Sequence, residues 1–208
     1  MSFDRIAPVY DTLSRLVYGK SMVASQRHFL AAISSHATVL IIGGGTGWIV
    51  QELFAVNSTC SVVYVEASQE MIRQTEKKIK PKDASRIRFV WSEEIPVGAV
   101  YDCIITNFFL DLFSEQHASN RIHQIKNILK EDGCWIVTDF VDEGRWWQKI
   151  LLKSMYIFFR TLSKIEATSL PPWRLQLERE GLRRKASQKF YHGFIESSLY
   201  VHVHKPLT

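Results

Sequence analysis

The chain has 208 residues, of which 46% are apolar, so it is long enough for one domain with a sizeable core and too apolar for a disordered chain. It has no apolar run of the roughly 18 residues that a membrane-spanning helix needs, and its start has no signal-peptide pattern. The three cysteines, Cys60, Cys103 and Cys134, are too scattered for a metal pair or a disulfide framework. We therefore expect a cytoplasmic protein. The net charge of +5 is uneven: residues 144–208 hold 12 Lys and Arg against 4 Asp and Glu, net +8, whereas residues 1–143 hold 14 against 17, net −3.

The first 143 residues alternate between short apolar runs and amphipathic segments. The apolar runs predict strands over residues 37–44, 61–67, 87–91, 101–109 and 134–140. The segments between them predict helices over 47–56, over 69–80 with Ser68 as N-cap, and after Ser114, where Gly133 is expected to stop the helix. Short strands that alternate with helices are typical of a doubly wound sheet with parallel strands.

The pattern changes after residue 143. Residues 144–165 predict a long aromatic helix, and residues 171–181 predict a short one. Two further runs, 183–192 and 194–203, predict an antiparallel hairpin at the sheet edge. The predicted fold is an α/β domain over residues 1–208, with a seven-stranded, mostly parallel sheet whose last hairpin is antiparallel.

A glycine cluster lies at the carboxyl end of the first predicted strand, where open parallel sheets bind ligands. A dinucleotide fingerprint that begins at Gly43 needs glycine where the chain has Trp48, and no Lys-Ser/Thr pair follows as in a phosphate loop. Glu66, at the end of the second strand, is suited to accept both hydroxyls of a ribose. Glycines and an acid without phosphate machinery favour an adenosyl ligand such as S-adenosylmethionine; the alternative is a structural turn beside a surface glutamate.

Four segments in the right order resemble class I S-adenosylmethionine-dependent methyltransferases: "VLIIGGGTG", "VVYVEASQEMI", "YDCIITNFFLDLF" and "LKEDGCWIVTDF". The segment "FDRIAPVYD" at residues 3–11 is similar to the N-terminal helix of the ubiquinone and menaquinone biosynthesis C-methyltransferases. The resemblance covers about residues 1–140. It implies a Rossmann-like fold, an N-terminal helical lid over residues 1–36, and a helical insertion over 144–181 that shapes the acceptor site.

The resemblance also implies which residues bind the cofactor. Gly43, Gly45 and Gly47 are expected at the methionine part, and Glu66 at the ribose. The remaining expected cofactor contacts are Ala67, Met71, Ser92 and Glu93 around the adenine, Asn107 facing the sulfonium, and Tyr10 from the lid. One position departs from the family pattern, because Ile41 stands where an acid commonly precedes the first glycine.

Two other functions stay open at this point. The glycine loop and Glu66 also resemble the aminopropyltransferases, but those usually carry Asp where this chain has Thr46, and their amine site is rich in aspartate where this chain has "TNFFLD". The second alternative is a non-catalytic module that binds S-adenosylmethionine and a partner. Methyl transfer to a small acceptor is the favoured prediction.

Few residues are candidates for proton transfer or metal binding. Asp111 is the best-placed catalytic base if the acceptor needs one, with an N-cap or turn as its alternative role. His117 is expected on a helix surface, and Asp139 at the end of the fifth strand near the pocket. His202 and His204 alternate on the last strand without a third ligand, so we expect no metal site.

The aromatic helix bears on the acceptor. It is either a core helix or a lid over an apolar or aromatic acceptor, and its basic border also suits a membrane surface. We expect no nucleic-acid partner, and the sequence does not indicate an oligomeric state. Trp146 and Trp147 point about 100° apart on a helix. We therefore expect one of them to be buried and the other to line an acceptor pocket with Phe158 or Phe159.

Overall fold

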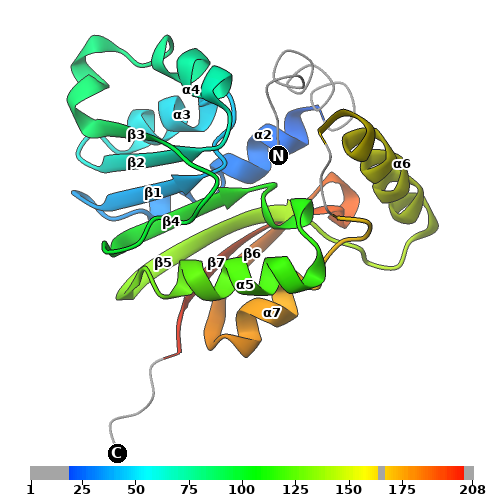
Figure 1. Cartoon of the computed structure of the whole chain (residues 1–208). Coiled ribbons are helices and arrows are strands. Elements are labelled where there is room, and N and C mark those ends of the chain that lie inside the picture. Colours follow the sequence, from blue (N-terminus) through cyan, green and yellow to red (C-terminus); the bar gives the residue numbers. More distant parts are fainter. Residues whose placement is uncertain (1–18, 164–166, 204–208) are drawn as a thin grey trace, which may run out of the picture.

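The structure is a computed structural model that describes residues 19–163 and 167–203. Its centre is a seven-stranded sheet in the order β3-β2-β1-β4-β5-β7-β6 (Figure 1). The strands are β1 (Thr38–Ile42), β2 (Ser61–Glu66), β3 (Ile87–Trp91), β4 (Tyr101–Asn107), β5 (Leu129–Phe140), β6 (Leu182–Phe190) and β7 (Ile195–His202). Strands β1 to β5 pair in parallel, whereas β7 runs antiparallel to β5 and β6. The predicted doubly wound sheet with an antiparallel last hairpin is confirmed.

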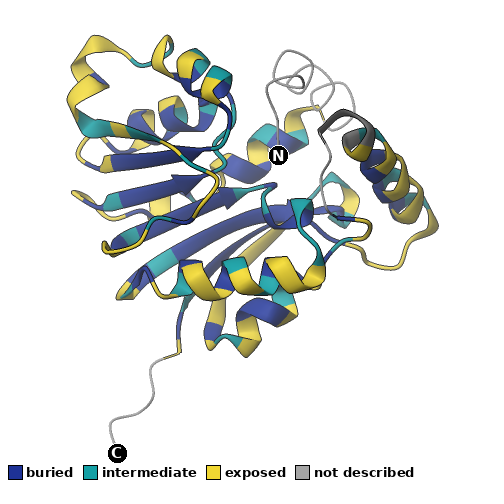
Figure 2. Ribbon diagram, in the orientation of Figure 1, coloured by how far each residue is buried: buried dark blue, intermediate teal, exposed yellow. Residues whose placement is uncertain are grey.

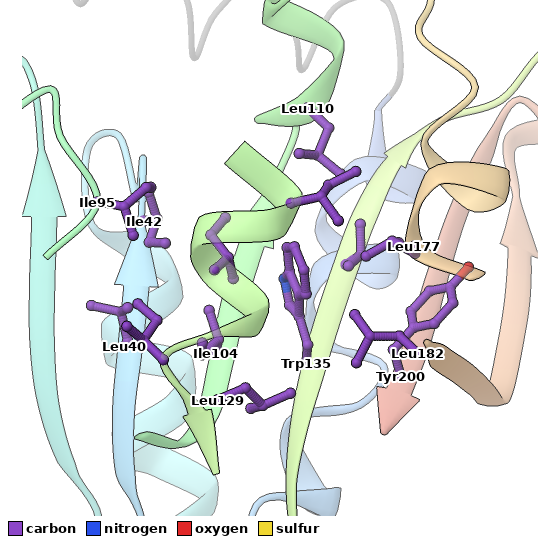
Figure 3. Packing of buried hydrophobic residues seen from close by; sticks show 14 of the residues in the cluster. Leu40, Ile42, Ile95, Ile104, Leu110, Leu129, Trp135, Leu177, Leu182 and Tyr200 are labelled. Carbon is purple, nitrogen blue, oxygen red and sulfur yellow. The ribbon is translucent and has the colours of Figure 1, made fainter. Parts of the chain in front are cut away.

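Helices cover both faces of this sheet. They are α2 (Lys20–Arg27), α3 (Trp48–Val56), α4 (Gln69–Glu76), α5 (Glu115–Lys126), α6 (Trp146–Ser163) and α7 (Trp173–Arg179). Because side chains alternate along a strand, β1 contributes to two cores. Leu40 shares one core with residues of α5 and α7, and Ile41 shares the other with residues of α3. Figure 3 shows the first core, in which Trp135 of β5 is fully buried.

The third buried cluster attaches α6 to the rest of the fold. Leu152 and Tyr156 of α6 belong to it, together with Phe108, Phe140 and Phe194 from the ends of the strands and their loops. The ring of Phe140 lies 4.9 Å from that of Phe108 and 5.1 Å from that of Phe194, between centroids. In Figure 2, α6 lies at the outer edge of the molecule with exposed residues along its outer side. No described helix is both long and apolar enough to cross a membrane.

One predicted boundary is wrong. Helix α5 ends at Lys126, and β5 starts at Leu129, so Gly133 lies inside a strand and does not end the helix. The pairing of β4 with β5 shifts register between Tyr101 and Cys103. A Cβ at Gly133 would lie 2.9 Å from the backbone oxygen of Lys130, so this irregular part of the strand needs a glycine.

Candidate functional site

A cavity of about 420 Å³ opens at the carboxyl ends of β1, β2 and β3. The sheet places it where the first two strands lie side by side, with Ile42 paired to Val65. Its lining combines the glycine loop after β1, the end of β2, the segment after β3, the tip of β4 and one face of α5. The lining residues are Ile42, Gly43, Gly45, Val65, Glu66, Ala67, Met71, Ser92, Glu93, Glu94, Phe108, Phe109, Leu112, Phe113, His117, Asn120, Arg121 and Gln124.

The glycines of the loop have different structural roles. A Cβ at Gly44 would overlap the ring of Tyr64, and a Cβ at Gly47 would overlap the side chain of Thr75, so both positions are closed by packing. Gly45 differs, because a Cβ there would meet no atom within 4 Å although the residue lines the cavity. Its φ of +62° is one that L-residues rarely adopt. The backbone at Gly45 is therefore the part of the loop that a ligand can approach closely.

Two side chains beneath the loop fix its position. The hydroxyl of Tyr64 donates to the Gly45 carbonyl at 2.7 Å, and the Thr75 hydroxyl lies 3.3 Å from the same oxygen. The Thr75 hydroxyl also donates to the Met71 carbonyl at 2.8 Å, within α4. The loop is thus tied to both β2 and α4, which preorganises it before any ligand binds.

Glu66 connects the loop to the start of α4. Its Oε2 accepts from the Gly45 N–H at 3.0 Å, and its Oε1 accepts from the Ser68 N–H at 2.9 Å. Ser68 is the N-cap of α4, as predicted, and its hydroxyl accepts from the Met71 N–H. Glu66 is 5% exposed and lines the cavity, and its two hydrogen bonds hold the carboxylate in a fixed orientation at the ligand side of the sheet.

The far wall of the cavity comes from the segment after β3 and from α5. The Ser92 N–H donates to the Glu66 carbonyl at 3.1 Å, which keeps this segment against β2. Arg121 of α5 pairs with Glu94 at 3.0 Å and so closes the wall. The contribution of α5 was not predicted, since nothing in its sequence marks the face formed by Asn120, Arg121 and Gln124 as ligand-facing.

The tip of β4 borders the cavity with a strained turn. Phe108 has a φ of +50°, and its N–H donates to the Thr138 carbonyl at 2.7 Å. Phe108 lines the cavity and also belongs to the cluster that holds α6. Next to it, Asn107 has a buried Oδ1 without a hydrogen-bond partner among the described residues. A buried acceptor of this kind is costly unless a donor reaches it.

Asp111 lies just beyond this tip, with its carboxyl group near that of Asp139. Oxygen Oδ2 of Asp139 accepts from the Leu110 N–H at 3.0 Å, and Oδ1 accepts from the Phe140 N–H at 2.8 Å. Burial raises the pKa of Asp139 to about 7. Burial and then the charge of Asp139 raise the pKa of Asp111 well above its ordinary value. Neither residue is part of the cavity lining, and the pair holds the 108–112 turn against the end of β5.

A second cavity of about 710 Å³ lies between α6 and residues 168–175. Its apolar wall includes Leu152, Tyr156 and Ile157, and three cations of α6 border it: Lys149, Lys153 and Arg160. Since Leu152 and Tyr156 share a buried cluster with Phe108, one apolar cluster has side chains in both cavities. Neither tryptophan at the start of α6 lines this cavity. Trp147 packs against Phe194 and Tyr191, and Trp146 is 74% exposed.

The structure brings most of the predicted site residues to the first cavity. Those that line it are Gly43, Gly45, Glu66, Ala67, Met71, Ser92 and Glu93. Gly47 is the N-cap of α3 behind the loop, and Asn107 adjoins the lining residue Phe108. Tyr10 and the first half of the predicted lid, residues 1–18, lie outside the described residues. The main residues that the sequence did not reveal are Tyr64 and Thr75, which act through the loop.

The chain is similar to known methyltransferases in sequence. A family model described as a methyltransferase domain matches residues 39–133. The ubiquinone/menaquinone biosynthesis C-methyltransferase UbiE of Syntrophotalea carbinolica is 30% identical over 146 residues, which are 66% of this chain and 59% of that protein. The chain thus spans about 59% of the length of this curated relative.

Solved structures show the same fold at low sequence identity. An O-methyltransferase family protein from Burkholderia thailandensis has a TM-score of 0.74 at 13% identity, covering 97% of this chain and 60% of that one. The methyltransferase CalO1 of calicheamicin biosynthesis, solved with S-adenosylhomocysteine, has a TM-score of 0.64 at 17% identity, covering 97% of this chain and 60% of that one.

Proposed function

Since this chain belongs to the class I S-adenosylmethionine-dependent methyltransferases, we propose that it transfers a methyl group from S-adenosylmethionine to a small apolar or aromatic acceptor. The observation that carries the proposal is the pairing of Gly45 and Glu66 in one cavity. Gly45 offers free space above its backbone, and Glu66 presents a buried, oriented carboxylate beside it.

The residues of the cavity fit this cofactor. Glu66, Ala67 and Met71 line the same cavity. We expect Glu66 to accept the ribose hydroxyls, and Ala67 and Met71 to contact the apolar face of the adenine ring. The unpartnered Oδ1 of Asn107 suits an N–H donor of the cofactor's ammonium group. In this role Asn107 would supply a partner for the ammonium group, although the chain has Ile41 where the family commonly has an acid. Among the described residues that line the cavity there is no lysine and no phosphate loop, and the cofactor has no phosphate.

The protein's own contribution to the reaction is to position the reactants and exclude water. When bound, the cofactor supplies an electrophilic methyl group on a positively charged sulfur. Tyr64, Thr75 and Glu66 hold the loop so that the cofactor is bound in one orientation. Phe108 and its aromatic neighbours form an apolar border at the side where an acceptor would approach.

The acceptor is proposed to be apolar or aromatic for two reasons. The cavity beside α6 has an apolar wall and a cationic border, which suits an apolar body with an acidic group. The sequence relative from Syntrophotalea is, by its name, a C-methyltransferase of quinone biosynthesis. The role of Asp111 as catalytic base stays a prediction. Its raised pKa favours the protonated carboxyl, which must lose its proton before it can act as a base. Aminopropyl transfer is not favoured, because the residues after β4 that line the cavity are apolar: Phe108, Phe109, Leu112 and Phe113.

The test is isothermal titration of the protein with S-adenosylmethionine, S-adenosylhomocysteine and NAD. We expect the two adenosyl-sulfur ligands to bind and NAD not to bind measurably. The variant Glu66→Ala removes charge-assisted hydrogen bonds of about 1.5–3 kcal/mol each before water competes, so S-adenosylhomocysteine should bind at least ~10-fold more weakly. Glu76→Ala, which removes an exposed carboxylate from the end of the neighbouring helix α4, is the matched control. Tight NAD binding, or equal affinity in Glu66→Ala and wild type, would contradict the proposal.

A further inference from the structure

Helix α6 exposes a row of large apolar side chains to solvent. Trp146, Ile150 and Ile157 are 74%, 59% and 60% exposed. At 100° per residue, their spacing places all three within about 40° of one another around the helix axis. They are three of the nine strongly exposed large apolar side chains in the described part of the chain. We call these three residues the apolar stripe.

A row of cations runs beside the apolar stripe. Lys149, Lys153 and Arg160 repeat the spacing of the stripe three residues later, so they lie about 60° to one side of it. The 18 residues of α6 include no Asp or Glu. Within residues 19–163 and 167–203, none of these three cations has an ion-pair partner. We call them the basic row.

The acidic residues that precede α6 do not neutralise this row. Glu143 pairs with Arg174 at 3.0 Å and with Lys189 at 2.9 Å, so two other cations already compensate its charge. Asp142 accepts the Gly144 N–H at 2.8 Å and leaves one negative charge against the three positive charges of the row. Figure 2 shows that the outer side of α6 is exposed. This side therefore combines exposed apolar area with a net positive charge.

The opposite side of α6 is already occupied. Leu152, Met155 and Tyr156 are buried against the ends of the strands, so the helix is anchored and its outer side has a fixed orientation. A helix with one buried side and an exposed side of tryptophan, isoleucine and cations is typical of attachment to a membrane surface. Tryptophan is favoured at the headgroup level, and lysine and arginine reach the phosphates from there.

We propose that α6 docks the protein on an anionic lipid bilayer, with the apolar stripe among the lipid headgroups and the basic row at the lipid phosphates. The positive charge of the basic row favours an anionic surface. The exposed apolar area of the stripe favours a lipid bilayer over a soluble anion. The proposed contact is peripheral, because it uses one side of a helix whose other side is buried in the fold. The proposal does not depend on cofactor binding, because none of its residues lines the cavity that contains Gly45 and Glu66. Ile157 and the basic row do border the cavity beside α6.

The test is cosedimentation of the whole chain with vesicles of phosphatidylcholine, with and without phosphatidylglycerol. We expect binding only to the anionic vesicles, and weaker binding as salt rises from about 50 mM to about 500 mM. Lys149→Gln with Lys153→Gln should weaken binding about 25-fold, since each cation near an anionic surface contributes about fivefold. Trp146→Ser with Ile157→Ser should weaken it at least ~10-fold.

Two matched controls separate this surface from general charge and hydrophobicity. Arg183→Gln with Lys185→Gln removes the same charge from exposed positions on β6. Val97→Ser with Val56→Ser removes apolar side chains that are 89% and 54% exposed elsewhere. Both controls should bind vesicles within ~2-fold of wild type. Equal losses in a control and in its α6 counterpart, or equal binding to neutral and anionic vesicles, would overturn the proposal.

A second copy of the chain is the other occupant that the experiment separates. If wild type sediments as a dimer, is not recovered with vesicles, and becomes monomeric in Trp146→Ser with Ile157→Ser, the apolar stripe is a protein interface and the proposal is wrong. Titration of each variant with S-adenosylhomocysteine keeps the two proposals distinct. Vesicle binding without cofactor binding would refute the proposed function alone, and the reverse result would refute the docking alone.

Discussion

Gly45→Ala tests whether the glycine loop is a ligand contact or only a turn. A Cβ at this position would meet no protein atom within 4 Å, so the substitution creates no internal clash. The φ of +62° costs an L-residue about 1–2 kcal/mol. Loss of unfolded-state entropy returns about 0.4–1 kcal/mol. We therefore expect the free energy of unfolding to fall by about 0.5–1 kcal/mol, with the fold retained.

The effect on ligand binding should be larger than the effect on stability. The new methyl group would project into the cavity at the place where the cofactor approaches the Gly45 backbone. We expect S-adenosylhomocysteine to bind at least ~10-fold more weakly, which is about 1.4 kcal/mol. Isothermal titration measures the affinity, and urea denaturation followed by circular dichroism measures the stability.

Gly98→Ala is the matched control. Gly98 also has a positive φ, of +82°, and a Cβ there would also meet no atom within 4 Å, but the residue does not line the cavity. It should lose a similar amount of stability and bind the ligand like wild type. If Gly45→Ala and Gly98→Ala bind S-adenosylhomocysteine equally well, the backbone at Gly45 does not contact the cofactor and the reasoning fails.

Two further predictions concern stability. The raised pKa values of Asp111 and Asp139 mean that the folded state holds protons that the unfolded state releases, so the free energy of unfolding should fall as pH rises from about 4 to about 7. Urea titrations at pH 5 and pH 7.5 measure this decrease in the free energy of unfolding, and Asp111→Asn should make it smaller. The same decrease in the variant and in wild type would show that the pair does not titrate in this range. Trp173 is 1% exposed and donates to the Phe140 carbonyl at 2.8 Å. Trp173→Ala should lower the free energy of unfolding by about 3–5 kcal/mol, whereas Trp146→Ala should change it by no more than about 0.5 kcal/mol. Similar losses in thermal denaturation of the two variants would contradict these environments.

The sequence determined the order of strands and helices and the place of the ligand loop. Short apolar runs between amphipathic segments are local patterns, and a parallel sheet is the way in which such elements bury their apolar faces. Gly45 lies in the loop after β1, and Glu66 is the last residue of β2. Both were predictable as parts of one site, because the carboxyl ends of adjacent parallel strands meet at one edge. The boundary at Gly133 was not predictable, because a glycine after a helix has the same local pattern as a glycine in an irregular strand.

Only the tertiary structure decided which side chains meet across the chain. Asp111 and Asp139 are 28 residues apart, and their proximity follows from the pairing of β4 with β5. The same holds for Tyr64 and Thr75, which fix the Gly45 carbonyl from two different elements. At the start of α6, the sequence shows that two adjacent tryptophans point in different directions. Trp147 packs against Phe194 and Tyr191 on the inner side, and Trp146 is left outside. Helical periodicity fixes only the angle between two side chains. The rotation of the helix about its axis is fixed by its contacts with other elements.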